Sequence, residues 1–390
     1  MRVRITGILA SLFVCCGAAG EVNVFHAEDT YRPISAGVRY LRDPSRALDI
    51  AQVAALAPEA FQLNGTDIVS LGLIDDPVWV RMDIQNEHPS GSIVLEFTNP
   101  RTTSVEFYQP VGGGRFEVSR AGPGYPFSER EIYCAHPVFP IYLPPGERAV
   151  FFLRLANVGI MRFQLHLWEH EAFHRHDALA NAPNWIVIGM LAGMLVLQLL
   201  AFLTLRERGY LYVALFVAAY LMVFLTMTGA GSMLLWPNWT WMGNHSPSLF
   251  ILLTLSMAAL FVSVFINRKG TAPRWAVVGL LLGAGCLAAA VGEIWAEGIA
   301  RMYALTFFCF AVPLFVLAAG IEGCRWGLPH ATRFLIAWGG LSLAQLLVNV
   351  IVLGVFPLPA RGEFPSGLGG APRDLRERSG SNRTHALAAE

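Results

Sequence analysis

Residues 185–205 read WIVIGMLAGMLVLQLLAFLTL, a run that contains no charged side chain. A helix needs about 20 predominantly apolar residues to cross the hydrocarbon core of a bilayer, so this run predicts a transmembrane helix. Five similar segments follow it, and residues 184–356 are therefore predicted to form a helical membrane domain. The six predicted spans are Trp185–Leu205, Tyr210–Gly229, Pro247–Ile266, Trp275–Gly292, Met302–Gly320 and Phe334–Phe356.

The composition separates a membrane part from a water-soluble part. Charged residues make up 14% of the 390-residue chain, whereas soluble domains average about 25%. The formal net charge is zero, which gives no basic field for nucleic acid. Residues 1–20 predict a secretory signal peptide, because Arg2 and Arg4 precede a short apolar run and the small residues 17–20 follow it. An uncleaved anchor is the alternative.

The charges of the loops predict the orientation. The loops after the first, third and fifth spans carry most of the Arg and Lys residues of this part of the chain, whereas the alternate loops carry only Arg301. Positively charged loops stay on the cytoplasmic side, so we expect a bacterial inner-membrane protein with a periplasmic N-terminal domain and membrane lipid as a partner. The signal peptide predicts the same side independently. The cytoplasmic charges are Arg206, Arg208, Arg268, Lys269, Arg274, Arg325 and Arg333.

Residues 21–178 are predicted to form an all-β domain. In Val78–Ile84, apolar residues alternate with Trp79, Arg81 and Asp83, which is the period of a half-buried strand. Seven or more short strands separated by turn residues predict a jelly roll or sandwich, and Asp49–Phe61 predicts a short helix. The other predicted strands are Ser92–Thr98, Ser104–Gln109, Arg115–Ser119, Val138–Leu143, Ala149–Ala156 and Met161–Trp168.

Five residues of this domain are candidates for ligand binding. Trp79, Arg81 and Asp83 share one strand face, and a ring beside a charged pair suits recognition of a sugar or a small acid. Tyr133 and His136 lie in an aromatic-rich loop segment, and binding residues are often found on loops. The alternative for both groups is structural: Trp79 packs in the core beside an Arg81–Asp83 pair, and the loop aromatics pack beneath the loop.

The sequence predicts no catalytic residue, no metal site and no cofactor. His170 and His174 are four residues apart, as on one helical face, but no third ligand accompanies them, so we interpret the histidines at 166–176 as part of a linker. Cys134 is the only cysteine of the β domain, and no Cys/His cluster has zinc-site spacing. Gln345 and Asn349 share a face of the sixth span and predict interhelical hydrogen bonds, with a polar path as the alternative.

Several motifs resemble those of a known family when they are read in order. Val78-Trp-Val-Arg81 with Asn86, Phe97-Thr-Asn-Pro100 and Phe139-Pro-Ile-Tyr-Leu-Pro-Pro-Gly146 resemble the type 2 extracellular domain of the bacterial seven-transmembrane receptors with diverse intracellular signalling modules. Arg206-Glu-Arg-Gly-Tyr-Leu-Tyr212 resembles the entry to the second span of those receptors. The resemblance covers about 27–356 and implies a jelly roll related to carbohydrate-binding modules.

The tail does not follow the family pattern. The resemblance implies a seventh span and a cytoplasmic kinase or diguanylate cyclase domain, whereas Pro357–Glu390 is polar and rich in arginine. We therefore expect a truncated or frame-shifted gene product without its output module, with a genuine six-span protein as the alternative.

The expected function is that of a receptor. It would bind a small ligand, such as a carbohydrate, in the periplasm and signal through its helices to a cytoplasmic module or partner, with homodimerisation left open. The alternative is a transporter or channel with an exported accessory domain, but no span carries a charge near its centre, as ion-coupled transport usually requires.

Overall fold

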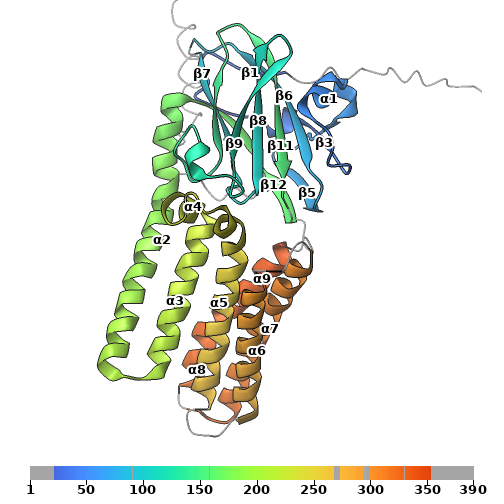
Figure 1. Ribbon diagram of the computed structural model, residues 1–390. Helices are drawn as coiled ribbons and strands as arrows, with labels where there is room; N and C mark the ends of the chain where they lie inside the picture. The colour runs from blue at the N-terminus through green and yellow to red at the C-terminus, as the bar shows by residue number, and fades with distance from the viewer. Residues whose placement is uncertain are drawn as a thin grey trace, which may run out of the picture.

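The computed structural model describes residues 22–352 apart from 90, 158, 268–272, 294, 296–298 and 329. The predicted signal peptide, 1–20, and the predicted tail, 357–390, lie outside the described residues. A β sandwich forms one end of the molecule and a bundle of long helices forms the other (Figure 1). Helix α2 extends along both parts.

The sandwich contains two main sheets. The larger sheet has the order β4-β3-β6-β11-β8-β9, with β1 parallel to β6, and the smaller has the order β10-β7-β13-β2. Strands β12 and β5 form a separate pair. The strands are β1 Asn23–Phe25, β2 Tyr31–Pro33, β3 Arg39–Arg42, β4 Gln62–Leu63, β5 Val69–Ile74, β6 Val78–Asn86, β7 Ser92–Phe97, β8 Ser104–Gly112, β9 Arg115–Ala121, β10 Val138–Tyr142, β11 Arg148–Ala156, β12 Gly159–Phe163 and β13 Leu165–Glu169.

One continuous apolar core joins the two sheets. In β6, Val78, Val80, Met82 and Ile84 are fully buried, as the alternation predicts. Phe107 of the larger sheet stacks on Phe139 of the smaller one, with ring centroids 5.2 Å apart. The prediction of an all-β sandwich is confirmed.

Two elements differ in their extent from the sequence prediction. The predicted strand 161–168 is two strands, because the chain leaves its pairing with β5 after Phe163 and joins β7 from Leu165. The predicted helix 49–61 is α1, Ile50–Ala55, with an Asp49–Gln52 capping box, followed by a 3-10 turn at Pro58–Ala60. Strands β1 to β5, which have two to six residues each, are not among the predicted strands.

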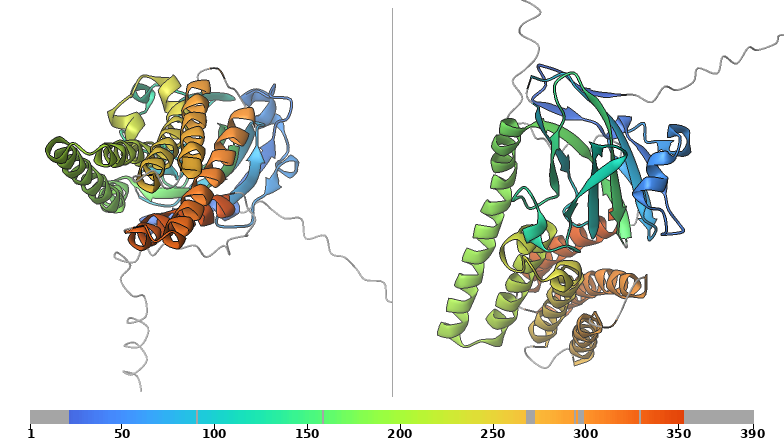
Figure 2. Two further views of the ribbon diagram at one scale, coloured as in Figure 1. Left: turned by 90° about the horizontal axis from the view of Figure 1, so that it is seen from below. Right: turned by 45° about the horizontal axis from the view of Figure 1, so that its top comes forward.

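Six helices of the described residues are long and apolar enough to cross a membrane. Each overlaps one predicted span, but α2 begins 15 residues before the predicted start at Trp185, so residues 170–178 of the predicted β domain are helical. Residues 353–356 of the sixth predicted span lie outside the described residues. The short helix α4 lies between α3 and α5 on the side of the sandwich (Figure 2). The sixth span is α8 and α9 joined by a π-helical turn at Leu335–Gly339. The helices are α2 His170–Leu205, α3 Arg208–Met227, α4 Ala230–Leu234, α5 Thr240–Ile266, α6 Pro273–Gly292, α7 Ile299–Arg325, α8 Ala331–Phe334 and α9 Gly340–Val352.

A hydrogen bond between side chain and backbone joins the last helix to the bundle. Asn349 Nδ2 donates to the Cys309 carbonyl of α7 at 2.7 Å, and Gln345 Nε2 donates to Asn349 Oδ1 at 2.9 Å. The interhelical interpretation is confirmed for Asn349, whereas the Gln345 amide bonds within α9 to Asn349. The Asn349 amide joins two helices, which is the usual role of such groups in a membrane bundle.

Replacing Asn349 with Leu is expected to lower the free energy of unfolding in detergent by about 1 kcal/mol, because it removes the bond to α7. Gln345→Leu is the matched control, since it removes only the bond within α9. Thermal unfolding of the full chain measures both variants. A loss as large for Gln345→Leu as for Asn349→Leu would show that the bond to α7 does not contribute separately.

Candidate functional site

The first group of predicted ligand residues lies on the outer face of the larger sheet. Trp79 has no exposed surface, because α1, Phe61 and Phe152 cover it, so its ring packs in the core and has no surface to offer a ligand. Arg81 Nε donates to Asp83 at 3.2 Å. These contacts are those of the structural alternative, in which Trp79 is a packing residue and Arg81 pairs with Asp83.

The same sheet face carries a polar and aromatic cluster, which we call the sheet-face cluster: Glu106, Tyr108, Tyr125 and Arg154. The hydroxyls of Tyr108 and Tyr125 both donate to the Glu106 carboxylate, at 2.9 and 2.5 Å, and Arg154 pairs with it at 3.4 Å. Burial and the hydrogen bonds to Glu106 raise the pKa of both tyrosines, so they remain hydrogen-bond donors. In the sequence of β8, Glu106 and Tyr108 alternate with the apolar Val105 and Phe107, and this alternation could have indicated that these two cluster residues share the outer face of the sheet.

The second group of predicted residues lies elsewhere, at the contact with the helices. Tyr133 is 70% exposed, and its hydroxyl donates to the Met233 carbonyl of α4 at 3.3 Å. His136 is largely covered and contacts Glu96. The five predicted residues therefore do not form one site: three lie on β6, and two lie between β9 and β10.

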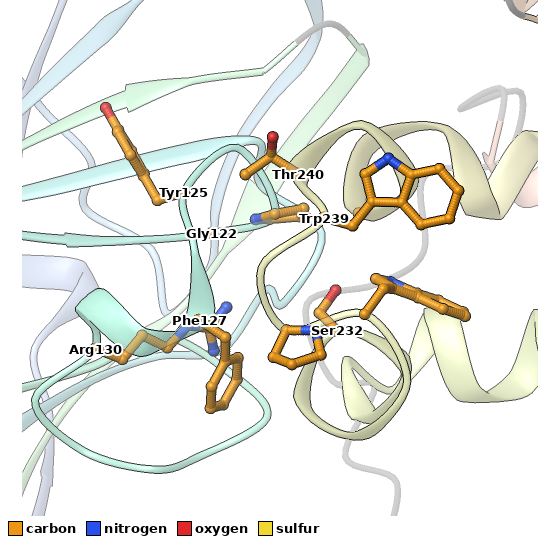
Figure 3. Close-up of a pocket in the computed structure, with 11 residues that line it drawn as sticks. Gly122, Tyr125, Phe127, Arg130, Ser232, Trp239 and Thr240 are labelled. Atoms are coloured by element: carbon orange, nitrogen blue, oxygen red, sulfur yellow. The ribbon is translucent and has the colours of Figure 1, made fainter.

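The segment that contains Tyr133 and His136 joins the sandwich to the membrane helices. We call residues 122–137 the docking loop and residues 228–243 the outer loop. The Phe127 amide donates to the Pro237 carbonyl at 2.6 Å, and Ser128 Oγ donates to Asn238 Oδ1 at 3.2 Å. Figure 3 shows a small pocket between the two loops, with Gly122, Phe127 and Arg130 of the docking loop on one side and Ser232 and Thr240 of the outer loop on the other, while the Tyr125 ring points away from the outer loop.

Two glycines of the outer loop allow this close approach. A Cβ at Gly229 would lie 2.4 Å from the Ala135 carbonyl oxygen, and a Cβ at Gly243 would lie 2.8 Å from the Pro123 carbonyl oxygen. Gly229 also has φ +79°, which side chains rarely adopt. The docking loop therefore packs directly on the backbone of the outer loop.

A buried carboxylate organises the opposite side of the docking loop. Glu96 of β7 contacts His136 Nε2 and His166 Nδ1, each at 3.1 Å, and accepts a hydrogen bond from Trp168 Nε1 at 2.6 Å. We call these four residues the Glu96 cluster. Burial opposes ionisation of Glu96, but the hydrogen bonds from the two histidines hold its pKa well below its usual range.

The same contacts keep His136 charged. Burial alone would lower the pKa of His136, but hydrogen bonds to Cys134 and Glu96, and their charges, raise it from 6.5 to about 10. A raised pKa stabilises the folded state fully at pH values below 6.5, and this contribution is lost as the pH rises towards 10. The cation of His136 therefore joins β7 to the docking loop at neutral pH.

The melting temperature of the full chain in a metal-free buffer is expected to fall as the pH rises from about 6.5 to 10, because His136 loses its proton and its pairing with Glu96. Scanning calorimetry across this range measures the effect. The variant His136→Gln should lose most of this slope, whereas His26→Gln, at an exposed pair, should keep it. An unchanged slope in His136→Gln would contradict the assignment.

Helix α2 connects the sandwich to the first span without a break. It begins at His170, directly after β13, and runs for 36 residues to Leu205, which is about 54 Å at 1.5 Å per residue. Phe173, in its first turns, is 1% exposed and packs with Val94, Cys134 and Trp168 of the sandwich. The helix passes through the boundary that the composition predicts near residue 184, with Pro183 inside it, so a single helix joins the sandwich to the first span.

The linker histidines serve packing in the described structure. His166 belongs to the Glu96 cluster, and the rings of His170 and His174 pack against each other with centroids 4.9 Å apart. His176 stacks on Trp168 with ring centroids 4.3 Å apart. His166 therefore lies on β13 and the other three histidines lie in the first turns of α2, so this segment is a strand and a helix rather than a separate linker.

A β sandwich that docks on the outer loop of a membrane-helix bundle, and continues into its first helix, is the arrangement expected of a membrane receptor with an extracellular sensor domain. Two family models match the chain and support this class. Residues 35–169 match the model described as 7TMR-DISM extracellular 2, and residues 181–371 match the model described as 7TM diverse intracellular signalling. The chain belongs to this family of receptors, as its motifs indicate.

A comparison with curated proteins gives no match. The two matched models describe a sensor domain and a membrane domain, and neither describes a catalytic domain.

Proposed function

We propose that the sandwich binds a small polar ligand, such as a carbohydrate, on the bacterial periplasmic side of the inner membrane, and that the helices transmit the signal to a cytoplasmic output module or partner. The observation that carries the proposal is the double connection between the two parts. Helix α2 is continuous with β13, and the docking loop packs on the outer loop. A sensor needs such a connection, whereas a tethered accessory domain does not.

The sheet-face cluster is the proposed ligand site. Its hydroxyls, carboxylate and guanidinium groups supply both donors and acceptors for sugar hydroxyls, and Tyr108 adds an aromatic surface 5.3 Å from Trp79. Tyr125 belongs to this cluster and also lines the pocket at the outer loop. A ligand that competes for Glu106 would therefore release Tyr125 and shift the position of the docking loop.

Such a shift requires a ligand that binds one arrangement of the docking loop more tightly than the other. We expect a sugar or small carboxylate to bind the full chain in detergent and to change hydrogen exchange in the docking loop. Isothermal titration of a broad ligand panel, followed by exchange measurements, tests this. The variant Glu106→Gln should weaken binding about tenfold or more, while Glu117→Gln on β9 should not.

Two outcomes would contradict the proposal. If no sugar or carboxylate in the panel binds, the proposed class of ligand is wrong. Binding without any change in exchange at residues 122–137 would remove the proposed route of transmission.

A further inference from the structure

Three potential metal ligands from distant parts of the sequence converge beside the Glu96 cluster. Cys134 and His136 come from the docking loop, and Asp177 comes from α2. Cys134 Sγ lies 3.5 Å from His136 Nδ1 and 3.4 Å from Asp177 Oδ1, and one ligand atom of each residue lies within 4.8 Å of the others. No metal site was expected from the sequence, because no Cys/His cluster has zinc-site spacing. Asp177 is 43 residues from Cys134, and only the fold brings the two together.

The distances between these atoms suit a tetrahedral ion. Zinc lies about 2.3 Å from sulfur and about 2.0 Å from nitrogen or oxygen, which places neighbouring ligand atoms about 3.5 Å apart. Two of the three separations already have this value. Thiolate, imidazole and carboxylate together favour zinc and similar transition metals over calcium or magnesium, which prefer oxygen ligands alone.

Two of the three ligands are oriented by a second group. His136 Nε2 contacts the Glu96 carboxylate at 3.1 Å, and Cys134 Sγ lies 3.5 Å from Nδ1 and 3.7 Å from Nε2, so Nδ1 is the ring nitrogen left for an ion. Asn181 Nδ2 donates to Asp177 Oδ1 at 2.8 Å. A carboxylate behind a histidine ligand is a common feature of zinc sites, because it fixes the ring and raises its basicity.

A cavity of about 160 Å³ adjoins two of the three ligands, Cys134 and Asp177. Cys134, Asp177 and Asn181 line it together with Tyr133 and residues of α2 and the outer loop. Space beside three protein ligands is typical of zinc sites that keep a fourth position for water or an exchangeable ligand.

We propose that Cys134, His136 and Asp177 bind one divalent transition-metal ion of the zinc class, with a fourth position open to this cavity. Because two ligands belong to the docking loop and one belongs to α2, the bound ion clamps the sensor domain to the first membrane helix. Occupancy of the site then controls how firmly the sandwich moves with α2. This clamp is independent of any ligand on the sheet face.

The test uses the purified full chain in detergent, stripped with a chelator and titrated with Zn²⁺ or Co²⁺. We expect about one equivalent to bind, a rise in melting temperature with Zn²⁺, and a thiolate-to-cobalt charge-transfer band with Co²⁺. Cys134→Ser should abolish that band, and Asp177→Asn should weaken binding at least tenfold. Cys324→Ser, on the far end of α7, is the matched control and should behave as the unmodified chain.

The proposal is overturned if the unmodified chain shows no thiolate–cobalt band and no zinc-dependent rise in melting temperature, or if the band persists in Cys134→Ser. The cobalt band and the rise in melting temperature are both measured on the unmodified chain, so this part of the test does not depend on whether a variant folds. No sugar or carboxylate is present, so a failure here leaves the proposed receptor function untouched, and the reverse also holds.

Discussion

The variant Glu96→Gln is expected to unfold with a free energy about 3 kcal/mol below that of the unmodified chain. Glu96 is 10% exposed at its side chain and is held by His136, His166 and Trp168. Removing one partner of a buried charge pair costs about 3–5 kcal/mol, because the remaining charge stays in a place where water cannot solvate it. We expect the lower end of this energy range, because His136 can lose its proton and the glutamine amide can keep some of the hydrogen bonds.

The measurement is thermal unfolding of the full chain at neutral pH in a metal-free buffer. Glu87→Gln is the matched control, because Glu87 also pairs with a histidine, His26, at 2.9 Å, but both side chains are more than 40% exposed. We expect that control to lose at most about 1 kcal/mol. Equal losses in the two variants would show that the Glu96 cluster adds nothing beyond an exposed ion pair.

Replacing Gly229 with Ala is expected to weaken the contact between the docking loop and the outer loop by about 3 kcal/mol. About 1 kcal/mol of this is backbone strain, because an alanine must adopt φ +79°. The rest is steric, since the new Cβ would lie 2.4 Å from the Ala135 oxygen and one backbone must move away. We expect faster hydrogen exchange at residues 122–137 and a lower melting temperature.

The control for this variant is Gly146→Ala. Gly146 has φ +83°, nearly the same backbone conformation, but no atom lies within 4 Å of its Cβ position. It should therefore lose only the strain energy and leave the exchange of the docking loop unchanged. If Gly146→Ala and Gly229→Ala behave alike, the effect is conformational and the docking contact contributes little.

The predictions from the sequence succeeded where a short stretch decides the structure by itself. The run 185–205 is apolar enough to insert into lipid wherever it stands in the chain, and the alternation in Val78–Ile84 marks one buried strand face. Trp79 shows the limit of this reasoning. Its position on the polar face of β6 was predicted correctly, but α1 and Phe61 cover that part of the face and bury the ring.

An all-β domain followed by membrane-spanning helices follows from the sequence alone, because hydropathy and period are properties of consecutive residues. The contacts of Glu96 with His136 and His166, of Gly229 with Ala135 and of Cys134 with Asp177 become visible only in the folded chain. These contacts join residues far apart in the chain. They depend on how the sheets pack, where α2 begins and how closely two loop backbones approach, and no local pattern of residue types records those distances.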